Sequence, residues 1–174
     1  MSVMKHKESI LAALGAALIF VTTMFIKIPS AYGYFNLGDA LILLFASTLS
    51  PFAAFLCGGI GSAFADISGG YIQYALFTFF IKGIEGLLAA VLYQRWHVRP
   101  FFSTMIAALW MLLGYFLCDW FLYQQVGAAA AGLLMNAAQG LAGALLATAL
   151  HSRFMDIAKR FKTKKKRTAD TASR

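Results

Sequence analysis

The sequence predicts an all-α integral membrane protein, a bundle of six transmembrane helices with both the N and C termini in the cytoplasm. The first observation is composition: the 174 residues are 60% hydrophobic and only 13% charged, about half the charged share of an ordinary soluble domain. The second is a series of long apolar runs, of which the first, residues 9–26, is long enough to span a bilayer. The third is that basic residues gather at both ends of the chain.

The apolar runs predict helices near residues 8–26, 38–50, 52–67, 74–94, 101–122 and 128–154. The uncharged stretch 40–65 is either one kinked helix or two helices separated at Ser50-Pro51, because proline is tolerated in a first helical turn and disfavours helix in the residue before it. If both basic ends lie on the cytoplasmic side, the chain must cross the membrane an even number of times, and two helices in the stretch 40–65 bring the number to six. We therefore expect a six-helix membrane domain over 1–154 and a basic, partly disordered cytoplasmic tail over 155–174.

Polar side chains interrupt these runs at particular depths. With the N terminus inside, Asp39 lies in the first turn of 38–50 at the outer side, Lys82 about 12 Å below the outer surface and Glu85 near the middle of a core about 30 Å thick. A charge in a bilayer is costly and rarely incidental. The full set falls in the outer half or at the middle: Asp39, Asp66, Lys82, Glu85, Asp119, Asn136 and Gln139. This asymmetry predicts a polar cavity that opens to the outside.

Helical periodicity supports convergence on such a cavity. Thr78, Lys82 and Glu85 share one face of the fourth predicted helix, and Asn136 and Gln139 share one face of the sixth. Structural roles remain open for the charged residues. One alternative is that Lys82 and Glu85 only neutralise each other's charge. The other is that Asp39, Asp66 and Asp119, which lie near helix ends, stabilise the helix or the adjacent turn and do not contact a ligand.

Signals for catalysis are missing from the sequence. The three histidines all fall on the predicted cytoplasmic side, and no metal-binding His-Glu-x-x-His pattern, nucleophile elbow or ATP-binding motif occurs. We expect no enzyme activity, no metal and no cofactor in this chain. The basic tail is expected to contact anionic lipid and not nucleic acid.

Four segments together resemble a known family. They are Gly33–Ala40, Gly58–Asp66, Lys82–Gly86 and Asn136–Gly140. In this order and at these spacings they are similar to the substrate-binding S components of energy-coupling factor (ECF) vitamin transporters. The nearest group is riboflavin-transporter-like and includes vitamin B6 and hydroxymethylpyrimidine carriers. The similarity runs from about residue 9 to residue 152.

The resemblance implies a multi-pass protein of a prokaryotic plasma membrane that binds a vitamin near the outer face. It also implies partners, namely a transmembrane scaffold subunit and two ATP-hydrolysing subunits that use ATP to drive inward release. In such families an Ala-x-x-x-Ala stripe on the first helix contacts the scaffold, and Ala12 and Ala16 match it here. The substrate-binding residues expected from periodicity and from the family are Asn36, Asp39, Thr78, Lys82, Glu85, Tyr115, Asp119, Asn136 and Gln139.

The identity of the vitamin follows from charge. An acid-rich cluster disfavours carboxylate vitamins and phosphorylated ligands and suits a neutral or cationic small heterocycle. We expect vitamin B6, as pyridoxine or pyridoxamine, with riboflavin and hydroxymethylpyrimidine as alternatives. A stand-alone small-molecule permease is the alternative class, but it predicts polar residues continuing through the inner half, where the sequence has almost none.

Overall fold

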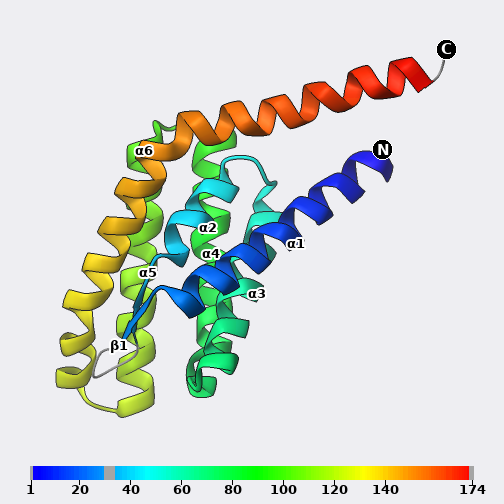
Figure 1. Cartoon of the computed structure of the whole chain (residues 1–174). Coiled ribbons are helices and arrows are strands. Elements are labelled where there is room, and N and C mark those ends of the chain that lie inside the picture. Colours follow the sequence, from blue (N-terminus) through cyan, green and yellow to red (C-terminus); the bar gives the residue numbers. More distant parts are fainter. Residues whose placement is uncertain (1, 30–33, 173–174) are drawn as a thin grey trace.

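The computed structural model describes residues 2–29 and 34–172, and the side chains of residues 6–29 and 34–159. In these ranges the chain forms six helices and one antiparallel two-stranded hairpin (Figure 1). The helices are α1 (Ser2–Phe25), α2 (Gly38–Ala46), α3 (Pro51–Gly69), α4 (Ile72–Gln94), α5 (Pro100–Tyr123) and α6 (Val126–Ala172), and the strands are β1 (Lys27–Pro29) and β2 (Tyr34–Asn36). The predicted all-helical membrane architecture is confirmed, since five helices are long and apolar enough to cross a membrane.

The separation at Ser50-Pro51 is confirmed. Pro51 stands in the first turn of α3, where its missing N–H leaves no helical hydrogen bond unmade. The same helix ends at Gly70, whose φ of 83° lies in the left-handed region that glycine adopts without steric cost. Only Gly70 and Tyr71 separate α3 from the start of α4.

The second helix is shorter than expected, and the prediction that it spans the membrane on its own is wrong. It ends at Ala46 and not near residue 50, so its nine residues extend about 14 Å, less than half of the bilayer core. The Ser47 and Thr48 hydroxyls donate back to the carbonyls of Leu44 and Phe45 at 2.6 and 3.1 Å, the local bonding that competes with helix continuation. Strand β2 of the hairpin ends at Asn36, two residues before this helix begins.

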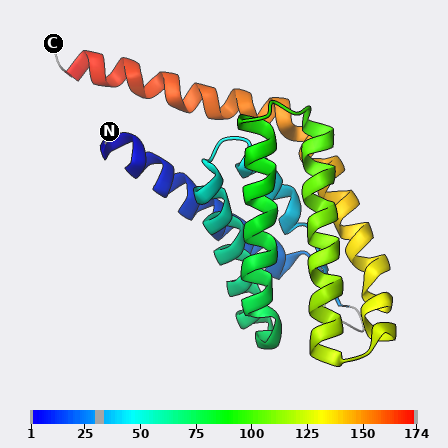
Figure 2. The same ribbon diagram turned by 180° about the vertical axis from the view of Figure 1, so that it is seen from behind.

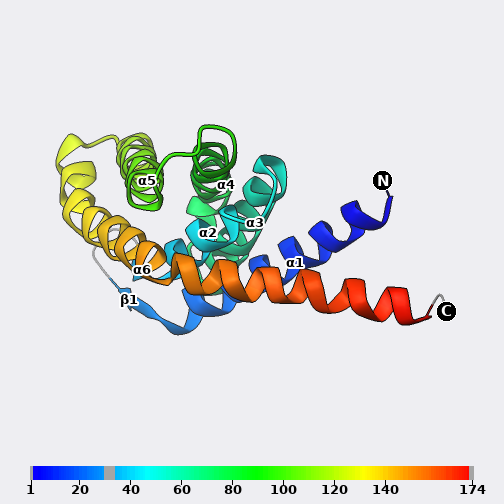
Figure 3. The ribbon, with the colours of Figure 1, turned by 90° about the horizontal axis from the view of Figure 1, so that it is seen from above.

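The core of the bundle is built around α2. All of its residues except Leu41 are buried, and Ile42, Leu43 and Leu49 just after it form the centre of the main apolar cluster. Viewed from above, α2 lies inside the ring formed by the longer helices (Figure 3). A short helix can be this apolar because no face of it meets lipid or water.

The long helices α3 and α4 run side by side at very close range (Figure 2). A Cβ added at Gly58 would lie 2.6 Å from the Lys82 carbonyl oxygen, and one added at Gly86 would lie 2.6 Å from the Ala54 carbonyl oxygen. Small residues are what allow backbones to approach this closely in membranes. The close approach positions Lys82 and Glu85, which α4 carries, beside the centre of the bundle.

Both termini lie toward the same end of the bundle (Figure 1). This agrees with the even number of passes predicted from the basic ends; their cytoplasmic location remains a prediction. The last helix extends beyond the expected end at residue 154 and reaches Ala172. The β1–β2 hairpin and the α3–α4 and α5–α6 turns lie at the opposite end, which we refer to as the outer end.

Candidate binding site

A polar cavity of about 40 Å³ lies in the outer half of the bundle, between the β1–β2 hairpin and helices α1, α3, α4, α5 and α6. Its lining is rich in tyrosine and contains two carboxylates and one ammonium. The lining residues are Thr23, Tyr34, Asn36, Ser62, Asp66, Tyr71, Tyr74, Thr78, Lys82, Tyr115, Asp119, Asn136 and Gln139. The structure therefore has a polar space at the depth where the sequence predicts one.

Most of the residues expected to bind substrate line this cavity. Asn36, Thr78, Lys82, Tyr115, Asp119, Asn136 and Gln139 do so. Asp39 and Glu85 are not among the lining residues; both are fully buried behind Lys82. Both contact the cavity wall through that lysine, and Asp39 also does so through Gln139.

The sequence left two roles open for Asp66, in the polar cavity or at the adjacent turn, and did not place it among the expected substrate-binding residues; the structure places it in the cavity wall. It is 3% exposed. The signal that could have identified it is its spacing of four from Ser62, which lines the same cavity, since residues four apart share a helix face. Tyr34 and Tyr71 were also missed, because aromatic residues near a membrane surface are usual interfacial anchors.

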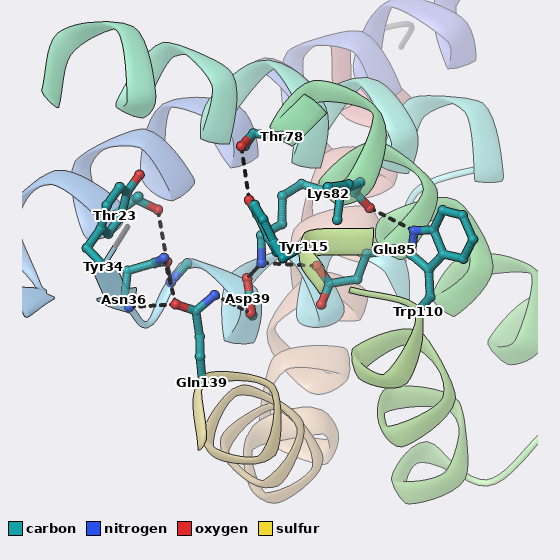
Figure 4. A network of polar contacts seen from close by, with 12 residues as sticks. Thr23, Tyr34, Asn36, Asp39, Thr78, Lys82, Glu85, Trp110, Tyr115 and Gln139 are labelled. Carbon is teal, nitrogen blue, oxygen red and sulfur yellow. Dashed lines mark hydrogen bonds and ion pairs between the residues drawn. The ribbon is translucent and has the colours of Figure 1, made fainter. Parts of the chain in front are cut away.

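Behind the cavity, Lys82 lies between two carboxylates (Figure 4). Its ammonium donates a hydrogen bond to Asp39 Oδ1 and lies 3.4 Å from Glu85 Oε2. All three side chains are nearly inaccessible. The expected location of Asp39 at the outer membrane surface is wrong: the hairpin carries the chain inward, so α2 begins at the depth of Lys82. The alternative considered for Lys82 and Glu85, that they pair with each other inside the protein, is therefore seen here next to the cavity.

Gln139 joins three elements next to this ion cluster (Figure 4). Its Oε1 accepts hydrogen bonds from the Asn36 backbone N–H at 2.8 Å and from Asn36 Nδ2 at 3.0 Å, and its Nε2 donates to Asp39 Oδ2 at 3.0 Å. Asn36 Oδ1 in turn accepts from the Gly38 N–H and the Thr23 hydroxyl at 2.8 and 3.3 Å. The hairpin, α2 and α6 are thus tied together beneath the cavity.

Each carboxylate in the cavity wall is held by a tyrosine. The Tyr34 hydroxyl donates to Asp66 Oδ1 at 2.6 Å, and the Tyr74 hydroxyl donates to Asp119 Oδ1 at 2.8 Å. Burial, reinforced by the nearby Asp66 charge, raises the pKa of the Tyr34 phenol well above its ordinary range. Tyr34 therefore remains a hydrogen-bond donor at every physiological pH and fastens the hairpin to α3.

A second concave surface lies between α1 and α3 and is almost entirely apolar. This groove has a volume of about 690 Å³, and its walls include Ala12, Ala16, Phe20, Phe52 and Leu56. Both residues expected to dock a partner therefore face one continuous groove. No group of three or more His, Cys, Asp or Glu side chains suited to a metal ion occurs in the part of the chain that the structure describes.

Comparison with known proteins agrees with this architecture. The family of ECF-type riboflavin transporter S components matches residues 3–155. Over 116 residues the chain is 38% identical to an uncharacterized protein of Pyrococcus woesei, covering 64% of this chain and 78% of that protein. Over 147 residues it is 29% identical to a protein of Lactococcus lactis subsp. cremoris named thiamine precursor transporter HmpT, covering 83% and 85% of the two chains.

No solved structure gives a significant match. The family match nevertheless covers every residue that lines the cavity or the groove. The resemblance seen in the four sequence segments is thus confirmed. This multi-pass membrane protein belongs to the family of S components of ECF-type riboflavin transporters.

Proposed function

We propose that this S component binds a single-ring heterocyclic vitamin precursor in the outer cavity, with hydroxymethylpyrimidine as the first candidate and vitamin B6 as the second. The observation that carries the proposal is the chemistry of the lining. Two buried carboxylates, Asp66 and Asp119, face one cavity with a single ammonium, Lys82. Such a lining favours neutral or cationic ligands with hydrogen-bond donors and disfavours carboxylates and phosphates.

The size of the cavity supports a small ligand. Its volume of about 40 Å³ is far below the roughly 300–1,000 Å³ typical of ligand pockets. Even a one-ring compound requires side chains to move, and a three-ring flavin requires much more movement. Tyr34, Tyr71, Tyr74 and Tyr115 offer flat faces against which one aromatic ring can stack.

The choice between the two candidates rests on the relatives. The lining suits pyridoxine and hydroxymethylpyrimidine alike, and charge alone had favoured vitamin B6. A relative that aligns with 83% of this chain is named a thiamine precursor transporter, and hydroxymethylpyrimidine is a thiamine precursor. We therefore place it first, and vitamin B6 and riboflavin become comparison ligands.

We further propose that transport requires a scaffold subunit and two ATP-hydrolysing subunits, and that the groove between α1 and α3 receives the scaffold. Family membership supports such partners. The wall of the groove is mainly apolar and includes Ala12 and Ala16, and small residues of this kind permit close helix approach in a membrane. ATP is used by the partners and not by this chain.

Isothermal titration of the purified protein tests the ligand. Hydroxymethylpyrimidine is expected to bind at micromolar concentration or tighter, pyridoxine and pyridoxamine more weakly, and riboflavin and thiamine not at all. Tight binding of pyridoxine with no binding of hydroxymethylpyrimidine would reverse the order of the candidates, and binding of none of the five would refute the proposal. Uptake into vesicles that lack ATPase subunits would instead favour a stand-alone permease.

A further inference from the structure

We propose that Asp66 selects the ligand by accepting a hydrogen bond from the exocyclic amino group of an aminopyrimidine, through its oxygen Oδ2. This inference rests on the proposed function and assigns a role that charge and family membership leave open.

The two oxygens of Asp66 are in different situations. Oδ1 accepts the Tyr34 hydroxyl at 2.6 Å. Oδ2 is buried and accepts no hydrogen bond from any residue that the structure describes. The Thr78 hydroxyl is close enough to interact with this carboxylate, but the hydrogen bond that it forms is with the Tyr115 hydroxyl, at 3.0 Å. A buried carboxylate oxygen without a donor is costly, so an arriving N–H donor gains more here than at a satisfied oxygen.

The protein's nearby cations are engaged elsewhere. The Lys82 ammonium pairs with Asp39 and Glu85. The Lys27 ammonium lies 4.3 Å from the centre of the Tyr34 ring and 5.2 Å from that of Tyr71, on the aromatic faces. Neither ammonium forms an ion pair with Asp66 within the described residues. Neither of these ammonium groups therefore competes with a ligand donor for Oδ2.

The aromatic surroundings set the shape of that ligand. The Tyr34 and Tyr71 rings lie 4.9 Å apart between centres and both line the cavity with Asp66. A flat heterocycle stacked against a tyrosine face directs its ring substituents outward in its own plane. An amino group on the ring edge is thus the kind of donor that can reach a carboxylate in the cavity wall. A hydroxyl donates only one proton and has more rotational freedom to lose.

Asp119 is the natural comparison because it is the other carboxylate of the cavity. Its Oδ1 accepts a hydrogen bond from the Tyr74 hydroxyl. Its Oδ2 lies against the α6 backbone at Gly132, where an added Cβ would be only 2.6 Å away. Asp119 Oδ2, unlike Asp66 Oδ2, is not one of the fully buried oxygens without a partner in the described chain, so it has less to gain from a ligand donor. We therefore assign selection of the amino group to Asp66 and not to Asp119.

The test compares two ligands on several variants. Hydroxymethylpyrimidine, which carries a 4-amino group, and its analogue without that group are titrated against the wild-type protein, Asp66→Asn, Asp119→Asn and Asp156→Asn. The wild type should prefer the amino compound by about tenfold or more, the effect of a hydrogen bond to a buried charged acceptor. Asp156 is exposed, so Asp156→Asn controls for loss of an acid and should keep the wild-type affinities.

In Asp66→Asn the new amide oxygen is expected to keep the Tyr34 bond, which turns its NH₂ toward the ligand's amino group. Donor then meets donor, and the preference for the amino compound should fall to within about twofold. Asp119→Asn should retain the preference even if both affinities drop. If Asp66→Asn does not fold, Asp66→Ala provides the same comparison.

The outcomes separate the two proposals. A wild-type protein that binds both pyrimidines equally well would overturn the role of Asp66 and leave the proposed function standing. A persistent amino preference in Asp66→Asn would also overturn it. A wild-type protein that binds neither pyrimidine would refute the aminopyrimidine as substrate and this inference together.

Discussion

Lys82 of α4 and Asp39 of α2, 43 positions apart in the sequence, form an ion pair in the interior of the bundle. Glu85 lies on the other side of the same ammonium, with Nζ and Oε2 3.4 Å apart. Two carboxylates thus share one lysine in a region where all three side chains are almost completely buried. The cluster holds Lys82 at the cavity wall.

The two carboxylates should differ in their contribution to stability. Asp39 accepts hydrogen bonds from Lys82 and Gln139, whereas neither oxygen of Glu85 has a hydrogen-bond partner in the described chain. We expect Asp39→Asn to lower the free energy of unfolding by about 3 kcal/mol and Glu85→Gln by about 1 kcal/mol or less. Denaturant unfolding in detergent measures both, with the exposed Asp156→Asn as control. Equal losses for the two variants would contradict this assignment.

Gln139 is expected to hold the hairpin in place over the cavity. In Gln139→Leu the Asn36 N–H loses its acceptor, so its amide hydrogen should exchange about tenfold faster, as for one lost buried hydrogen bond. Hydrogen exchange with mass spectrometry of the peptide containing Asn36 measures this. Gln73→Leu, at an exposed position on α4, is the matched control. Unchanged exchange in Gln139→Leu would show that the hairpin is held by other contacts.

Tyr34 should fasten the same hairpin in a way that does not depend on pH near neutrality. Because the pKa of Tyr34 is raised above its ordinary value near 10, its contribution is fully present below pH 10 and declines only as pH rises beyond that. Tyr34→Phe should therefore speed cleavage of the hairpin by protease to the same extent at pH 6, 7.5 and 9. An effect that vanishes within this range would mean that the phenol is not the donor in question.

Because α3 and α4 are in close contact, replacing Gly58 with alanine should destabilise the protein. Gly58→Ala forces a methyl group against the Lys82 carbonyl oxygen at 2.6 Å, and overpacking of this kind costs about 1–3 kcal/mol. A Cβ added at Gly127 meets nothing within 4 Å, so Gly127→Ala should be neutral or slightly stabilising. Thermal unfolding of both variants in the same detergent checks the difference. A Gly58→Ala protein as stable as Gly127→Ala would mean that the helices can separate freely.

The groove between α1 and α3 is tested by filling it. Ala12→Trp combined with Ala16→Trp should abolish copurification with the scaffold subunit, because the bulky rings occupy the groove, while ligand binding in the outer cavity, whose lining contains neither alanine, persists. Leu14 and Leu18 lie on α1 outside the groove and are 53% and 42% exposed. The matched double variant Leu14→Trp with Leu18→Trp should assemble normally. Normal assembly of the alanine variants would move the docking surface elsewhere.

Much of this molecule could be predicted from the sequence because membrane helices have strong local signals. Long uncharged runs, a proline at a helix start and basic ends predict the helices and the common side of the termini. Helical periodicity correctly placed Thr78 and Lys82 on one face, and seven of the nine residues expected to bind substrate line the cavity. Four short motifs were enough to suggest the family.

The depth and partners of the charged residues were decided by tertiary structure. Strands of three residues are too short to show a period, so the sequence did not reveal that the hairpin carries Asn36 inward and starts α2 at the depth of Lys82. A helical pattern tells which residues share a face, but not which neighbouring helix that face meets. For this reason Asp39 and Glu85, which were expected at the ligand, lie behind Lys82. Asp66, for which the sequence left a turn role and a cavity role open, lines the cavity, and its Oδ2 has no hydrogen-bond partner among the described residues.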